Sequence, residues 1–366
     1  MKTIERLSLS AQQDQWPAWR LTNDSGASVT IMSWGASILE ISVPDHKGVL
    51  NDVALGFDQL QDYKINAPKL GCIVGPYANR IHAGRFPLNG KIIQLECNSN
   101  GHHLHGGENG LHAQQWSLIA AENDANHSQI ELHCRLDKKA SGYSASYDIF
   151  VVYAWNNQCE LSIQYRARSS HDTVINLTQH SYFNLAGVES IESIEDHQLW
   201  INSSEICELD ESLIPTGRIQ STSKTALDFS RLTELSTRLR ANDSQINRVN
   251  GLDYNWVFNN DKTTIKLQAA LYDPHSLRHL RVFSDQPGLQ VYSGNFLDNE
   301  AGKYQQHYAP HSGLCLETQH FPDSPNHLNF PSTSLRQGEE FKSRSVYQFG
   351  LESPNLDAEF NPPTLY

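Results

Sequence analysis

The 366-residue sequence has no apolar run that approaches the ~20 residues needed to span a bilayer, and its first residues lack the apolar core of a secretory signal. It has no excess of positive charge either, because 28 Lys and Arg stand against 41 Asp and Glu. Nucleic acids and anionic membranes require a basic surface, so neither is an expected partner. The six cysteines are scattered without a CxxC pair, which predicts a reducing, cytoplasmic setting rather than a disulfide framework.

Regular alternation of strands and helices is also absent. Runs of β-branched and aromatic residues between polar turns predict strands, chiefly at 28–32, 38–43, 49–55, 86–88, 91–95, 130–136, 147–154, 160–166, 197–202, 264–270, 280–284, 289–293, 313–319 and 345–349. Only two short helices are expected, at 58–63 and 231–240. This pattern predicts an all-β fold, a sandwich or a barrel, in one domain over residues 1–350. Residues 351–366, rich in Pro, Asn and acids, are expected to form a loosely packed C-terminal tail.

Residues 176–185, with the sequence NLTQHSYFNL, combine a packing face with a hydrogen-bonding face. With the two-residue period of a strand, Leu177, Phe183 and Leu185 share one face with Gln179 and Ser181. The other face carries Asn176, Thr178, His180, Tyr182 and Asn184. A histidine among hydrogen-bonding groups suits a sugar site, although a half-buried strand whose polar face meets water fits the same pattern.

Glu317 lies within the apolar strand predicted at 313–319. A carboxylate buried there without a partner costs several kcal/mol, so it requires either an ion-pair partner or a raised pKa. Burial of this kind is how enzymes tune a general base. We therefore favour a catalytic role for Glu317 over a structural ion pair.

Other polar side chains cluster in four further stretches: Asn79-Arg80, residues 101–108, Gly251-Leu252-Asp253 and residues 285–295, which include Gln286. Amide, guanidinium and carboxylate groups together can hold a polyhydroxyl ring. Taken singly, each of these residues is more often an ordinary surface or turn residue.

His103 and His105 share one face of a predicted strand, as in the first half of a cupin-type metal site. The spacing from His105 to Glu108 is short for that pattern, and no convincing second half follows. The histidines equally suit a sugar hydroxyl, with Gly106-Gly107 permitting close backbone approach to a ligand. We do not expect a metal site.

The sequence has no G-x-S-x-G element, no phosphate-binding glycine loop, no H-E-x-x-H and no Rossmann fingerprint. The strongest chemical signals are therefore one histidine and one glutamate, each on a predicted strand.

In this order along the chain, these motifs resemble the aldose 1-epimerase (galactose mutarotase) family. The resemblance covers residues 23–349 and is carried by ANRI at 78–81, LHGG at 104–107, NLTQHSYFNL at 176–185, DESLIPTG at 210–217, GLD at 251–253, QPGLQ at 286–290 and CLETQHFPD at 315–323. It implies one large antiparallel β-sandwich with few short helices and a cleft on one sheet. It also implies interconversion of the α and β anomers of free hexoses, galactose and glucose above all, without a metal or organic cofactor.

The resemblance also assigns roles to individual residues. Glu317 falls on the general base and His180 on the general acid. Substrate-contacting positions fall on Asn79, Arg80, His105, Asp253 and Gln286. In the expected reaction the Glu317 carboxylate takes the proton of the C1 hydroxyl, and His180, held as imidazolium by that carboxylate, protonates the ring oxygen.

Two positions depart from the family pattern, since Pro76 replaces a common Arg and Gln179 a common Asn. Gln179 is expected to point away from His180, with little effect on the chemistry. Three alternatives remain open: a hexose-6-phosphate 1-epimerase, a non-catalytic sugar-binding protein of the same fold, and a cupin-like metal enzyme. Because the phosphorylated substrate requires a basic pocket, and only Arg80 is a clear candidate there, the free sugar is favoured.

Overall fold

The computed structural model describes residues 2–7, 16–189, 192–258, 264–354 and 356. Most of the predicted C-terminal tail, residues 351–366, therefore lies outside the described residues. The boundary at residue 350 stays a prediction, since the last strand, β30, continues to Leu351.

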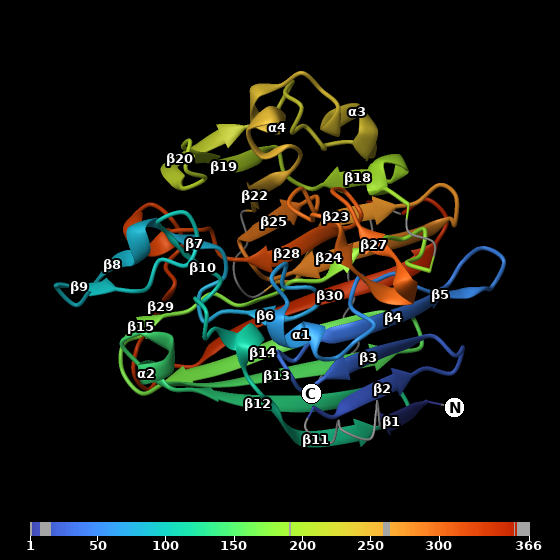
Figure 1. Ribbon diagram of the computed structural model, residues 1–366, viewed down its shortest axis with the longest axis horizontal. Helices are drawn as coiled ribbons and strands as arrows, with labels where there is room; N and C mark the ends of the chain where they lie inside the picture. Colours follow the sequence, from blue (N-terminus) through green and yellow to red (C-terminus); the bar gives the residue numbers. More distant parts are fainter. Residues whose placement is uncertain (1, 8–15, 190–191, 259–263, 355, 357–366) are drawn as a thin grey trace.

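Antiparallel sheets make up almost the whole molecule, which confirms the predicted all-β fold (Figure 1). The nine-stranded sheet has the order β11 (Ser117–Asn123), β12 (His127–Leu136), β13 (Tyr147–Asn156), β14 (Glu160–Ser169), β30 (Phe341–Leu351), β24 (Arg278–Ser284), β23 (Lys266–Tyr272), β18 (Gln198–Ile201) and β21 (Thr233–Glu234). The six-stranded sheet has the order β17 (Tyr182–Phe183), β28 (Leu314–Gln319), β25 (Gly288–Tyr292), β22 (Asp253–Val257), β19 (Glu205–Leu209) and β20 (Pro215–Ser221).

A five-stranded sheet and several two-stranded pairs complete the β-structure. The five strands are β1 (Thr3–Leu7), β2 (Ala18–Thr22), β3 (Ser28–Met32), β4 (Ile38–Pro44) and β5 (Leu50–Asp52). The two-stranded pairs are β6 (Ile73–Val74) with β16 (Thr178–Gln179), β7 (Arg80–Ile81) with β10 (His103–Leu104), β8 (Arg85–Leu88) with β9 (Lys91–Gln94), β15 (Thr173–Val174) with β29 (Ser334–Leu335), and β26 (Glu300–Ala301) with β27 (His307–Tyr308).

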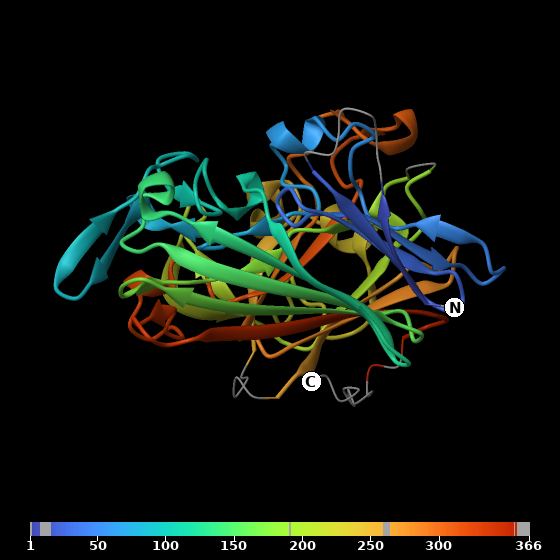
Figure 2. The same ribbon diagram turned by 90° about the horizontal axis from the view of Figure 1, so that it is seen from below.

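The six- and five-stranded sheets pack on the nine-stranded sheet with one continuous apolar core between them (Figure 2). Strand β12 shows why, because its buried and less buried residues alternate and its apolar side chains all enter the core. The Tyr347 hydroxyl of β30 donates to the carbonyl of Leu316 in the six-stranded sheet at 3.0 Å. Trp155 Nε1 of β13 donates to the carbonyl of Ala27, next to the five-stranded sheet, also at 3.0 Å. These two hydrogen bonds connect the nine-stranded sheet to the sheets that pack on it.

Helices are few and short, as expected from the sequence. The α-helices are α1 (Asp62–Ile65), α2 (Lys138–Ser141), α3 (Leu235–Leu239) and α4 (Ser244–Val249), and the 3-10 turns are His82–Gly84, Leu111–Ala113, Ile194–Asp196, Lys303–Gln305 and Ser324–Asn326. The helix predicted at 231–240 begins only at residue 235, because residues 233–234 pair with β18 instead. Within the described ranges, no helix has the length and apolar character to cross a bilayer.

The segment 176–185 is not the single strand that its pattern predicts. β16 pairs with β6 and β17 pairs with β28, and His180 lies in the connection between these two pairs. The whole segment is buried, so its polar face does not meet water. Asn176 and Asn184 instead donate to main-chain carbonyls, at 3.1 Å and 3.0 Å, and so hold neighbouring loops.

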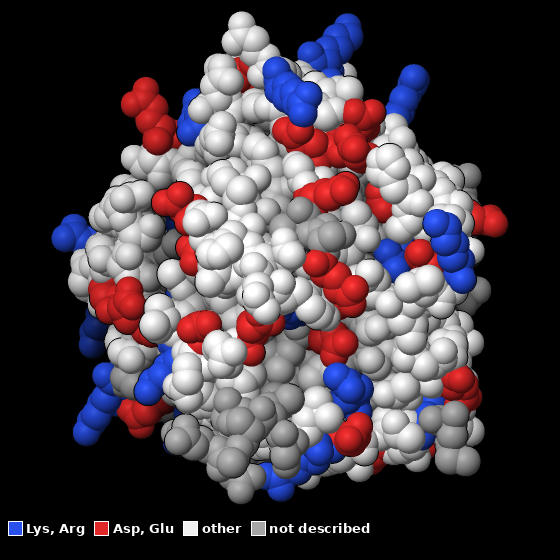
Figure 3. Space-filling model, turned by 45° about the vertical axis from the view of Figure 1, so that its right-hand side comes forward, with Lys and Arg blue, Asp and Glu red and all other residues white. Residues whose placement is uncertain are grey.

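Acidic and basic side chains are interspersed on the molecular face shown in Figure 3, in keeping with a formal net charge of −13. All six cysteines are free thiols.

Candidate active site

A cleft of about 280 Å³ opens on the face of the six-stranded sheet that is turned away from the core. Six of the seven residues predicted to form the site line this cleft: Asn79, Arg80, His105, His180, Asp253 and Glu317. The two-residue period of the strands explains part of this convergence, because the residues opposite one another in the antiparallel register leave the sheet on the same side. Gln290 lies opposite Glu317, and Tyr292 lies opposite both Asp253 and Cys315.

His180 is held in the cleft by main-chain hydrogen bonds on both sides of its own peptide unit. Its N–H donates to the carbonyl of Cys72 at 2.9 Å, and its carbonyl accepts from the N–H of Gly71 at 3.0 Å. The ring lies 5.2 Å from the ring of His105, edge to face, and 5.2 Å from that of Tyr182. The short connection between β16 and β17 therefore presents the imidazole in one fixed position.

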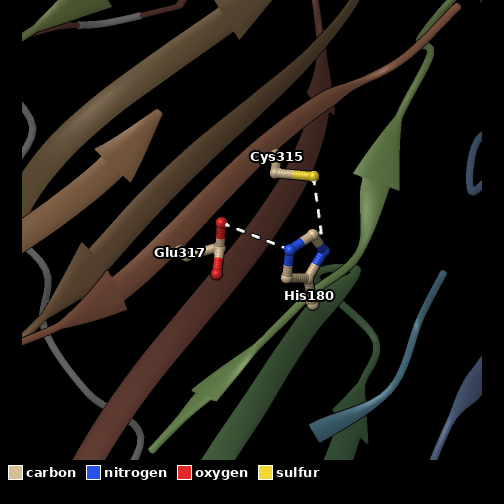
Figure 4. A group of neighbouring side chains, drawn as sticks. All are labelled: His180, Cys315 and Glu317. Atoms are coloured by element: carbon tan, nitrogen blue, oxygen red, sulfur yellow. Dashed lines mark hydrogen bonds and ion pairs between the residues drawn. The ribbon is translucent and has the colours of Figure 1, made fainter. Parts of the chain in front are cut away.

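Glu317 faces His180 directly from β28 (Figure 4). Its Oε1 lies 3.7 Å from His180 Nε2, and the two side chains are 2% and 6% exposed. Its Oε2 is buried and has no hydrogen-bond partner. Burying a carboxylate oxygen without a partner costs free energy, so this oxygen is available to accept a proton or a hydrogen bond from a ligand.

The surroundings raise the pKa of Glu317 well above its ordinary value, because burial and the nearby Asp253 carboxylate both disfavour its charge and Arg80 offsets them only in part. Burial lowers the pKa of His180 to about 4. The expectation that Glu317 would hold His180 as an imidazolium is therefore wrong, because burial favours the neutral ring. Desolvation of the ring is the largest cause, the charge of Lys69 acts in the same direction, and a main-chain hydrogen bond at His180 opposes them. The two shifts together favour a neutral His180 and a protonated Glu317.

Cys315 contacts the ring nitrogen of His180 that is turned away from Glu317. Residues 315 and 317 are two apart on β28, so both side chains leave the strand on the side that His180 meets. The Cys315 sulfur lies 3.7 Å from His180 Nδ1. Burial holds the pKa of this thiol well above its usual value, so it stays protonated and can donate to Nδ1. The ring proton is then left on Nε2, which faces Glu317.

His105 and Asn79 form a second fixed unit at the cleft wall, beside the pair of short strands β7 and β10. The Asn79 main-chain N–H donates to His105 Nδ1 at 3.2 Å, which places the proton of the neutral ring on Nε2. Desolvation lowers the pKa of His105 well below its ordinary value, so the ring is neutral. Asn79 Oδ1 accepts from the N–H of Arg80 at 2.8 Å, which leaves the amide nitrogen as its donor.

Asp253 connects two further polar side chains of the cleft. Its Oδ1 accepts from Gln290 Nε2 at 2.6 Å, and its Oδ2 lies 3.6 Å from an Arg80 guanidinium nitrogen. The arrangement presents a carboxylate, an amide and a guanidinium on one side of the His180–Glu317 pair. Such a set can exchange hydrogen bonds with several hydroxyls of a bound ring.

Comparison with known proteins identifies the group to which this chain belongs. The model of the aldose 1-epimerase family matches residues 17–348, which is most of the chain. The chain belongs to the aldose 1-epimerase family. It is an isomerase with the family's activity, and its relatives include a galactose mutarotase of Bos taurus, 39% identical over 324 residues that cover 88% of this chain and 91% of that protein.

Bacterial members of the family are also similar along their whole length. An aldose 1-epimerase of Escherichia coli (strain K12) is 32% identical over 334 residues, 91% of this chain and 94% of its own. The solved structure of galactose 1-epimerase from Lactobacillus acidophilus NCFM superimposes with a TM-score of 0.83 at 25% identity, covering 96% of this chain and 99% of the other.

Gln286 is the one predicted site residue that the structure of this epimerase places elsewhere. It lies in the turn before β25, where its Oε1 is 2.9 Å from His320 Nδ1 and its Nε2 donates to Asp285. It lines a separate depression, with His320 and residues 332–335. Four residues of an extended strand span about 13 Å, so Gln286 and the cleft residue Gln290 are far apart. The structure therefore does not place Gln286 in the cleft, and Gln290 of the same motif lines it instead.

His103 and His105 do not share the strand face that a metal site would need. Strand β10 ends at Leu104, and His105 has a left-handed backbone with φ +53°, which turns its side chain away from the alternation. The His103 nitrogens are both used inside the protein, by the Glu96 carbonyl and the Tyr143 hydroxyl, each at 2.9 Å. Gly106 packs against the carbonyl of Gly75 rather than offering its backbone to a ligand.

In the described part of the chain, one group of side chains has metal-ligand spacing, namely His180, Cys315 and Glu317, whose ligand atoms lie within 4.8 Å of one another. The His180 ring presents different nitrogens to the other two residues.

Sequence reasoning missed several lining residues of this epimerase cleft, namely Lys69, Gln290, Tyr292, Phe296 and Glu300. For Gln290 and Tyr292 a signal was present, because aligning the two predicted strands at 289–293 and 313–319 places them on the face of Glu317. The others lie outside those strands, so periodicity could not have placed them.

Proposed function

We propose that this epimerase interconverts the α and β anomers of free hexoses such as galactose and glucose, with Glu317 as the general base and His180 as the general acid. The observation that carries the proposal is the buried His180–Glu317 pair, 3.7 Å apart at the base of the cleft. Ring opening requires one group to take a proton from the C1 hydroxyl and another to give a proton to the ring oxygen O5. Both oxygens are bonded to C1. The acid and the base must therefore face each other across a few ångströms, as these two side chains do.

The pair performs the reaction while it holds one proton in total. The raised pKa of Glu317 and the lowered pKa of His180 favour that proton on Glu317 before a sugar binds. The reactive form has the proton on His180 and a carboxylate on Glu317. A bound sugar stabilises this form, since its C1 hydroxyl donates to the carboxylate and its ring oxygen accepts from Nε2.

The chemical steps follow from this arrangement. Glu317 takes the proton from the C1 hydroxyl, the C1–O5 bond breaks, and His180 delivers its proton to O5. The open-chain aldehyde rotates about the C1–C2 bond, and the 5-hydroxyl attacks the other face of the carbonyl. Glu317 then returns its proton to O1 and His180 takes the proton of O5, so the enzyme ends as it began.

The other polar groups of the cleft hold the ring during rotation. Arg80, the Asn79 amide and His105 Nε2 are donors, and the Asp253 carboxylate is an acceptor. Gln290 Oε1 is buried without a hydrogen-bond partner, so a sugar hydroxyl that donates to it removes a desolvation cost. These contacts favour a polyhydroxyl ring, and the proton transfers need no cofactor.

A non-catalytic sugar-binding protein is less well supported by this geometry. Simple binding gains nothing from burying an unpartnered carboxylate oxygen beside a neutral imidazole, whereas acid–base catalysis requires both groups.

Polarimetry tests the proposal directly. Freshly dissolved α-D-galactose or α-D-glucose should relax to its equilibrium rotation faster with the protein than without it, and glucose 6-phosphate measured alongside tests the phosphorylated alternative. Relaxation of both free sugars at the uncatalysed rate would contradict the proposed function.

A further inference from the structure

Lys69 is a cation of the cleft that no acidic side chain neutralises. It is half-buried and lines the cleft together with His180 and Glu317. Its only hydrogen bond in the described residues is to the Asn66 carbonyl, at the limiting distance of 3.5 Å, and it forms no ion pair there. Arg80 in the same cleft is paired, since it faces Asp253 at 3.6 Å, and the buried Lys303 lies 2.5 Å from Asp52.

The loop that carries Lys69 is held firmly by its own hydrogen bonds. The Asn66 side chain accepts from the N–H of Leu70 at 2.7 Å and donates to its carbonyl at 3.0 Å. The Tyr182 hydroxyl, itself in the cleft, donates to the carbonyl of Pro68 at 2.7 Å. Lys69 has a left-handed backbone with φ +62°, a conformation that favours glycine. The main chain at Lys69 is therefore held in a fixed place at the wall of the cleft.

The charge of Lys69 acts on the interior of the cleft. It is among the causes that lower the pKa values of His105 and His180, so the ammonium lies close enough to disfavour a second positive charge at both rings. The same field favours a negative charge on a bound ligand.

We propose that Lys69 forms a subsite for a carboxylate on the sugar, so that the cleft accepts hexuronates as substrates besides neutral hexoses. The inference rests on the proposed function and names a further substrate class for the same site. The anomeric step is unchanged, because a carboxylate at C6 takes no part in opening or closing the ring.

A carboxylate fits this subsite better than a phosphate does. Lys69 supplies one positive charge, and the Arg80 charge is already balanced by Asp253. Glu300 lines the same cleft, so a phosphate dianion would meet twice the repulsion that a monoanionic carboxylate meets. One unpaired ammonium is therefore matched to one carboxylate.

The test compares α-D-galacturonic acid with α-D-galactose at pH 7, where the uronic acid is ionised. The protein should accelerate the anomerisation of both sugars. Lys69→Met should lower the ratio of kcat/KM for galacturonate over galactose about fivefold, the size of one partly exposed charge pair. Lys64→Met is the matched control, because Lys64 is exposed in helix α1, just before the loop that carries Lys69, and lies outside the cleft. The galacturonate-to-galactose ratio of this variant should equal that of the unmodified protein.

Ionic strength supplies a second readout that does not depend on a variant. Added salt screens charge pairs, so kcat/KM for galacturonate should fall between low and high salt while that for galactose stays level. Acceleration of galactose without acceleration of galacturonate would overturn the inference and leave the proposed function standing. Acceleration of neither sugar would overturn both, and a larger kcat/KM for glucose 6-phosphate than for galacturonate would replace the carboxylate with a phosphate.

Discussion

His180 Nε2 lies 3.7 Å from Glu317 Oε1, and neither side chain is more than 6% exposed. This distance is too long for a strong hydrogen bond, so both groups remain available to a ligand in the cleft that contacts the two together. Burial disfavours the charge on each group, which lowers the pKa of His180 to about 4 and raises that of Glu317. The pair therefore carries one proton over a broad range of pH.

The first prediction concerns the pH dependence of kcat/KM. Below about pH 4 His180 becomes protonated while Glu317 also carries a proton, so the pair holds two. Glu317 then cannot act as a base, and activity is lost. Above the raised pKa of Glu317 the pair holds no proton to deliver, and activity falls again. A bell-shaped profile with a plateau between these limits is expected from initial rates of mutarotation. An acid limb at the usual histidine value, near pH 6.5, would contradict the pairing.

The second prediction concerns the two charges beside Glu317. Asp253 raises the pKa of Glu317 and Arg80 lowers it. Asp253→Asn should therefore move the alkaline limb of the profile to lower pH, and Arg80→Met should move it to higher pH. Both variants should also raise KM by about tenfold, because each removes a charged hydrogen-bonding group. Shifts of the alkaline limb in the same direction would show that these charges do not act on Glu317.

The third prediction separates two glutamines of the same sequence motif. Gln290→Leu should raise KM at least several-fold, because Gln290 lies in the cleft and bonds Asp253. Gln286→Leu should leave KM unchanged and lower the melting temperature instead, because Gln286 bonds His320 outside the cleft. Polarimetric kinetics and thermal unfolding of both variants measure this difference, and a raised KM in Gln286→Leu alone would reverse the assignment.

The fourth prediction concerns the thiol behind His180. In the reactive imidazolium form Nδ1–H faces the Cys315 sulfur. Cys315→Val removes this polar contact, which orients the ring, so kcat should drop about fivefold. Cys315→Ser keeps a polar group at that place and should retain most of kcat. Because a hydroxyl and an isopropyl group both differ from the thiol in packing, melting temperatures of the two variants serve as the control. Equal kcat values for Cys315→Val and Cys315→Ser would show that Cys315 does not position the His180 ring.

The amino-acid sequence predicts the strands of this epimerase well where one face is buried and the other is not. Strand β12 alternates along its whole length, and β13 and β14 alternate over about half of theirs, where one face stays less buried. The segment 176–185 has the same alternation and does not form one strand, because its two halves pair with different partners, β6 and β28. Local periodicity reports which residues are buried, but it does not report which strand is the neighbour.

The His180–Glu317 pair could be predicted from the sequence. Glu317 was conspicuous because a carboxylate in an apolar strand is unfavourable without a function. Lys69 and Glu300 were not conspicuous, since charged residues in loops are usually exposed and only the folded chain places these two in the cleft. The charge state of His180 was predicted wrongly, because the balance between burial and a neighbouring carboxylate depends on depth and distance, which no sequence pattern supplies.

The most direct test is polarimetry of fresh α-D-galactose with Glu317→Gln, beside Glu205→Gln as a control on an exposed glutamate of the same sheet. A raised pKa means that Glu317 costs stability at pH 7, where the unfolded chain has it ionised. The neutral Gln variant should therefore keep its circular dichroism and melt at the same or a higher temperature. Its acceleration of mutarotation should fall by about 10²–10⁴-fold, while Glu205→Gln keeps full activity. A folded Glu317→Gln protein with full activity would contradict the assignment of Glu317 as the base.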